Sequence, residues 1–157
     1  MENYLQIMQQ SLCEKKEILT AIEEKSRQQA QLIAKEDFSL EEIDKNMDEK
    51  SELIDKLTLL DNGFDSLYEK VRQELNDNKE LYREQIKAMQ ELISGIMEKS
   101  ASIEALEARN KAAIEEYFRN RKKELKSNRR VSDVAYQYYK SAKNLEYVDS
   151  QFLDQKK

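Results

Sequence analysis

The side chains that could perform chemistry in this chain are almost all acidic or basic, and histidine is absent. Adjacent carboxylates occur at Glu23–Glu24, Glu41–Glu42 and Glu115–Glu116. Such pairs can act as general acid and base, but on helices this rich in charge they are typical of solvated faces. Without histidine, no side chain has an ordinary pKa suited to proton transfer near pH 7. We therefore expect that the protein is not an enzyme.

The sequence also gives no sign of a metal or cofactor site. The single cysteine, Cys13, has no histidine or second cysteine with which to form a zinc site, and it is expected to be a small residue beside a helix contact. Gly63 and Gly95 are isolated, so no glycine-rich loop is present to cradle a phosphate. We expect no metal and no cofactor.

The composition favours a coiled coil or an elongated helical bundle. Charged residues make up 38% and hydrophobic residues 39% of the 157, and there is no proline to interrupt a helix. The first residues lack the basic-then-apolar pattern of a secretory signal, and no apolar stretch approaches the roughly 20 residues of a membrane span. We expect a cytoplasmic protein without stable membrane insertion.

The charge is distributed unevenly along the chain. Residues 1–118 have a net charge of −11, residues 119–130 of +6, and residues 131–157 of zero. The basic segment 119–130 could contact nucleic-acid phosphates. However, the rest of the chain is acidic, and cations at the end of a helix complement its dipole. We expect no nucleic-acid partner, and salt-dependent binding of labelled DNA, RNA or anionic liposomes would contradict this.

The apolar pattern predicts three helices, at about residues 3–35, 40–75 and 79–126. Together they form an all-α fold, an elongated antiparallel three-helix bundle or coiled coil in residues 1–130. A heptad frame runs through the first two helices, and polar residues interrupt it at five seam positions. These interruptions are Lys15, Ser26, Gln29, Lys50 and Asp61.

Local signals mark where the helices begin and end. Ser39 followed by Glu42 is a capping box, and Phe38 and Ile43 are placed to form a hydrophobic staple. The asparagine-rich run 76–78 predicts the second turn, with Asp77 as a weaker helix cap. Asp61, Asn62 and Gly63 resemble a turn, but the heptad frame passes through them without a change of phase. A helix that continues past Gly63 is therefore favoured over a break, and Gly95 is expected to be a close-packing point.

The third helix is predicted to be the longest, at roughly 70 Å against roughly 50 Å for each of the others. Its far half should therefore extend beyond the bundle and leave an apolar stripe for a partner, with Glu107 and Asn110 on or near the seam. The stripe comprises Ile103, Leu106, Ala113, Ile114, Tyr117 and Phe118.

The last 27 residues, 131–157, form an aromatic tail that is expected to be flexible or to fold on binding. Its large apolar residues are aromatic and irregularly spaced, and its charges balance. Polar segments with scattered aromatic residues bury themselves poorly but make good contacts for a partner. The candidate contact residues are Tyr136, Tyr138, Tyr139, Tyr147, Phe152 and Leu153.

The chain resembles the FlgN/FliT-type flagellar export chaperones over nearly its whole length. The similar features are the hairpin of heptad helices, the segments 49–71 and 103–118, and the aromatic ending that closes on Phe152, Leu153 and Asp154. The resemblance implies a small chaperone without ATPase activity. It would hold the C-terminal helical region of late export substrates, the hook-associated or filament-cap proteins, and deliver them to the export apparatus.

The same resemblance implies a contact site on the stripe of the third helix, while the tail tyrosines would contact the substrate or the export gate. The competing interpretation is a coiled-coil structural adaptor whose exposed stripe is covered by a second copy of the chain. An adaptor should form a stable dimer, whereas a chaperone should be monomeric or form only a weak homodimer.

Overall fold

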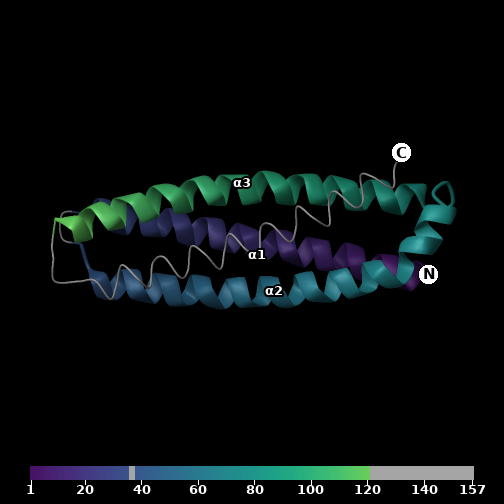
Figure 1. Cartoon of the computed structure of the whole chain (residues 1–157), viewed down its shortest axis with the longest axis horizontal. Coiled ribbons are helices and arrows are strands. Elements are labelled where there is room, and N and C mark those ends of the chain that lie inside the picture. The colour runs from purple at the N-terminus through teal and green to yellow at the C-terminus, as the bar shows by residue number, and fades with distance from the viewer. Residues whose placement is uncertain (36–37, 121–157) are drawn as a thin grey trace.

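A computed structural model describes residues 1–35 and 38–120, and within them the chain forms three long α-helices (Figure 1). Helix α1 spans Glu2–Ala34, α2 spans Leu40–Asp77 and α3 spans Arg83–Arg119. The predicted all-α, three-helix bundle is thereby confirmed. The predictions that fall on residues 36–37 and 121–157, the aromatic tail included, lie outside the described residues.

The chain reverses direction at each connection, so α2 runs antiparallel to both α1 and α3 (Figure 1). Helix α1 packs closely against both of the other helices. Among the described residues, no Cα atom of α2 comes within 8 Å of a Cα atom of α3. Helix α1 is therefore the shared neighbour of α2 and α3, and the core lies where the seams of all three helices meet.

The heptad frame predicted for the first two helices is the buried frame of the structure. In α1, the seam positions from Leu5 to Gln29 are all buried, including the three polar interruptions. In α2, the seam positions from Ile43 to Leu75 are buried in the same way. Helix α3 follows a matching frame, in which the fully buried residues Met89, Ile93, Ile96 and Ile103 supply the apolar layers. The 3-4 spacing of the sequence thus determines which face of each helix is covered.

The first connection is closed by the predicted cap. The Ser39 side chain accepts a hydrogen bond from the Glu42 backbone N–H at 3.3 Å, so α2 begins where the capping box indicates. Phe38, predicted to staple the helix start, packs against the core, and its ring stacks on Tyr117 with the ring centres 4.2 Å apart. This contact joins the first connection to the last turn of α3.

The second connection is longer than predicted, and the prediction that the third helix begins at Lys79 is wrong. Residues 78–82 form turns, and α3 begins only at Arg83, with Tyr82 rather than Asp77 at its cap position. Asn78 ends α2 by hydrogen bonding to the Glu74 carbonyl through both its backbone N–H and its side-chain amide. Leu81 belongs to these turns and is 70% exposed.

Both glycines lie inside helices, as the unbroken heptad frame predicts. Helix α2 continues through Gly63, and a Cβ atom added there would meet nothing within 4 Å. A Cβ atom added at Gly95 would lie 3.2 Å from the Lys16 Nζ. Gly95 is therefore the predicted close-packing point, and a side chain of α1 lies over it.

Candidate functional site

The predicted stripe on α3 lies against the bundle rather than beyond it. Ile103, Ile114 and Phe118 are buried, at 0%, 1% and 6% exposure. Leu106, Ala113 and Tyr117 are half-buried. The expectation of an overhanging half-helix is wrong because α3 has 37 residues, against 33 in α1 and 38 in α2. Helices of matched length cover one another from end to end.

Three aromatic rings gather where this stripe ends. Tyr117 stacks on Phe38 and meets the ring of Phe118 edge to face, with the Tyr117 and Phe118 ring centres 5.5 Å apart. Both geometries are favourable for aromatic pairs. The end of α3, from which the tail continues, is therefore fixed to the first connection.

Five polar residues of the three seams meet in one buried cluster, which we call the distal polar cluster: Ser26 and Gln29 of α1, Lys50 of α2, and Glu107 and Asn110 of α3. The Lys50 ammonium donates to Glu107 Oε1 and to Gln29 Oε1, both at 2.6 Å. Ser26 Oγ donates to the same Glu107 oxygen at 2.5 Å. Asn110 Nδ2 donates to the Ser26 carbonyl at 2.8 Å and to Gln29 Oε1 at 3.3 Å. The sequence identified Ser26, Gln29 and Lys50 as interruptions, and Glu107 and Asn110 as residues on or near the seam, but not their meeting in one cluster.

Lys50 is the most deeply buried charge of this cluster, at 1% exposure. Burial lowers the pKa of the Lys50 ammonium, and the nearby Glu107 carboxylate opposes this effect. A buried ion pair with hydrogen bonds to its neighbours can be tolerated, whereas either partner left alone is strongly unfavourable. The cluster therefore links all three helices at a single level of the bundle.

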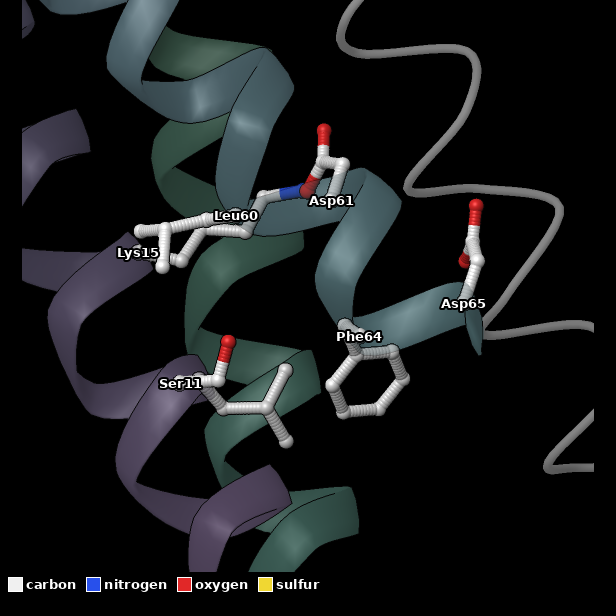
Figure 2. Close-up of a pocket in the computed structure, with 7 residues that line it drawn as sticks. Ser11, Lys15, Leu60, Asp61, Phe64 and Asp65 are labelled. Carbon is white, nitrogen blue, oxygen red and sulfur yellow. The ribbon is translucent and has the colours of Figure 1, made fainter. Parts of the chain in front are cut away.

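A second polar pair joins α1 to α2 in the other half of the bundle. Lys15, buried on α1, forms an ion pair with Asp61 of α2. The pair lies beside a small cavity with room for about one water molecule, and Figure 2 shows the ammonium directed at the Asp61 carboxylate. Burial lowers the pKa of Lys15, and the Asp61 carboxylate counteracts the change.

Asp65 lines the same cavity, with its carboxylate lying apart from the ion pair (Figure 2). Burial raises the pKa of Asp65 above its usual 3.8, and the negative charge of Asp61 one turn earlier raises it further. A carboxyl group with a raised pKa in the folded state favours folding most when it is protonated. Its contribution is present below pH 3.8 and is lost as the pH rises through the folded-state pKa.

We therefore expect Asp65→Asn to raise the melting temperature at pH 7, because the amide removes a half-buried negative charge next to Asp61. The gain should shrink as the pH falls and disappear near about pH 3, where the aspartate is itself protonated. Thermal unfolding followed by circular dichroism across this range is the measurement. The matched control is the exposed Asp55→Asn. A gain for Asp65→Asn that stayed constant with pH would contradict the assignment.

The residues on either side of each seam show which side of α2 and of α3 contacts α1. On α2, Asn46 donates to the Lys25 carbonyl and Glu49 forms an ion pair with the Lys25 ammonium, so this flank faces α1. On α3, Gly95 lies under Lys16 and Lys99 forms an ion pair with Glu23 at 3.5 Å, so this flank also faces α1. Helix α1 thus uses both of its flanks, while α2 and α3 each turn one flank away from it.

The described residues contain no group of three or more histidine, cysteine, aspartate or glutamate side chains able to hold a metal ion. Cys13 is exposed, next to the buried seam residue Leu12. Within the same residues, none of the helices is both long and apolar enough to cross a membrane. The fold and these sites define a charged antiparallel helical bundle held in register by buried polar contacts. Comparisons with protein-family models, curated proteins and solved structures give no match to this chain.

Proposed function

We propose that this protein is a cytoplasmic chaperone of the flagellar type III export pathway, of the FlgN/FliT type and without enzymatic activity. In this role it binds the C-terminal helical region of late export substrates, the hook-associated or filament-cap proteins. It keeps them unassembled and delivers them to the export apparatus, with the export gate as a second contact.

The observation that carries this proposal is the half-buried apolar edge of α3, which precedes the aromatic tail in the sequence. Leu106, Ala113 and Tyr117 retain part of their surface on the last turns of α3, and the chain continues from there into the tail. A helix that offers a half-buried apolar edge, followed by tyrosines, suits the capture of an amphipathic helix.

The deeply buried members of the predicted stripe hold the bundle together in this proposal and do not contact the partner directly. Ile103, Ile114 and Phe118 belong to the core. Contact with the substrate is assigned to the half-buried edge of the stripe and to the tail. The proposed tail residues are Tyr136, Tyr138, Tyr139, Tyr147, Phe152 and Leu153.

The test is co-purification of the chain with the late flagellar substrates encoded in the same genome. We expect a 1:1 complex with one hook-associated or cap protein, and loss of that complex when the chain is truncated after Arg130. Circular dichroism of the truncated chain controls for loss of the bundle. No complex with any substrate, together with a stable homodimer at about micromolar concentration, would favour the structural adaptor instead.

A further inference from the structure

The run Asp61, Asn62 and Gly63, which resembles a turn in the sequence, lies inside α2. Roughly four turns of helix or more separate it from either end of α2, so it is not part of a frayed terminus. All three residue types disfavour a helix interior. Aspartate and asparagine compete for backbone hydrogen bonds, and only proline is less favourable than glycine.

The packing of the bundle does not require a glycine at position 63. Gly63 is exposed, and a Cβ atom added there would meet nothing within 4 Å. At Gly95, by contrast, an added Cβ atom would lie 3.2 Å from the Lys16 Nζ, so the absence of a side chain there has a packing reason. What Gly63 supplies is backbone freedom, which increases the entropy gained when the helix opens at this point.

The contact of α2 with α1 is incomplete at the same level. A small cavity lies there, lined by Leu12 of α1 and by Leu60, Asp61 and Phe64 of α2, among others (Figure 2). Side chains that border a void lack partner atoms on that side. An opening of α2 at this level therefore breaks fewer favourable contacts than it would in a layer without a void.

The ion pair at this level opposes an opening only weakly. Burial is the largest influence on the pKa of Lys15 and lowers it, which shows that the ammonium is poorly solvated beside Asp61. Opening returns both charges to water, and this hydration offsets the attraction that is lost. Lys50 differs, because it donates hydrogen bonds both to Gln29 of α1 and to Glu107 of α3. An opening at Lys50 would break contacts with two helices.

We propose that α2 contains a point of local opening at residues 61–65, where the helix breaks and re-forms while the rest of the bundle stays folded. Low helix propensity, a glycine that packing does not require, a void and a weakly stabilising ion pair act at the same point. Each opening uncovers the side chains of Leu12 and Phe64, which the closed bundle buries. Elements that move when a protein binds a partner come from such segments of low local stability. The opening itself is independent of the proposed function.

Residue-resolved hydrogen–deuterium exchange of the full-length chain, expressed as protection relative to an unfolded chain, tests the proposal. We expect the amides of 62–67 to be at least about tenfold less protected than those of 48–54, although both segments lie inside α2. Gly63→Ala should slow exchange at 62–67 about fivefold, because alanine favours the helix by about 1 kcal/mol over glycine.

The control is Ser94→Ala, an exposed change on α3 that also raises helix propensity. It should leave the exchange of 62–67 unchanged, because these amides exchange through the local opening in α2. Slowing of 62–67 by Ser94→Ala would show exchange through unfolding of the whole bundle and would overturn the proposal. Equal protection of 62–67 and 48–54, or no effect of Gly63→Ala on 62–67, would overturn it as well. Since no partner is present, these results are independent of whether co-purification succeeds.

Discussion

Lys50→Met is expected to lower the free energy of unfolding by about 3–5 kcal/mol, because it leaves the buried Glu107 carboxylate without its cation. The Glu107 oxygen would retain only the hydrogen bond from Ser26. Gln29 would lose the Lys50 contact as well but keep the one from Asn110. Urea unfolding followed by circular dichroism measures this loss. The exposed Lys45→Met removes the same charge nearby and should change the stability by less than about 0.5 kcal/mol.

The companion variant Lys50→Met/Glu107→Met should recover most of this loss. Methionine approximates the volume of both side chains, and replacement of a buried ion pair by apolar residues is often neutral or stabilising. Ser26 can then hydrogen bond to a carbonyl of its own helix. If the double variant were no more stable than Lys50→Met, the loss would come from packing at Lys50 rather than from the unpaired charge.

We infer that the distal polar cluster determines the alignment of the helices more than it adds to stability. A seam of repeating apolar layers permits helices to slide by one heptad at modest cost, whereas a buried charge tolerates only the register that pairs it. Lys50 pairs with α3 at Glu107, and Lys15 pairs with α2 at Asp61. With two such pairs in different halves of the bundle, a shift of either α2 or α3 would leave a charge buried alone.

The seams could be predicted from the sequence because burial in a long helix follows the 3-4 spacing directly. Each of Lys15, Ser26, Gln29, Lys50 and Asp61 was recognised as a polar residue in an apolar frame, and each is buried. Their pairing could not be predicted, because it depends on how far each helix is displaced along its neighbour. Because buried charges must be paired, a seam lysine and a seam glutamate such as Lys50 and Glu107 could have been expected to lie at the same height along the bundle axis.

The overhang of the third helix was predicted wrongly, because both ends of that helix were misplaced. The sequence run from Asn76 to Tyr82 contains good capping residues, and the prediction placed the turn at 76–78 and the helix start at about Lys79. In the structure, residues 78–82 form turns and the Tyr82 side chain is buried. The later start, with the end at Arg119, removes the excess length from which an overhanging stripe was inferred.

Ile114→Asp is expected to destabilise the protein by about 4 kcal/mol or more, because it places a carboxylate in the core. Ile114 is 1% exposed and belongs to the same apolar core as Ile33, Phe38 and Tyr117. The introduced aspartate would have no cation in the part of the core that these residues form. Losses of this size are characteristic of an unpaired charge in the interior.

Thermal and urea unfolding measure the effect, and Ala112→Asp provides the control. Ala112 is exposed two residues earlier on α3, so the same charge there should cost less than about 0.5 kcal/mol. Equal stability of the two variants would show that the end of α3 is not packed in solution. If Ile114→Asp is strongly destabilising, its failure to bind a substrate would report unfolding rather than a lost contact. Variants of the tail tyrosines change none of the core residues named here, and they are therefore the ones that can locate the partner site.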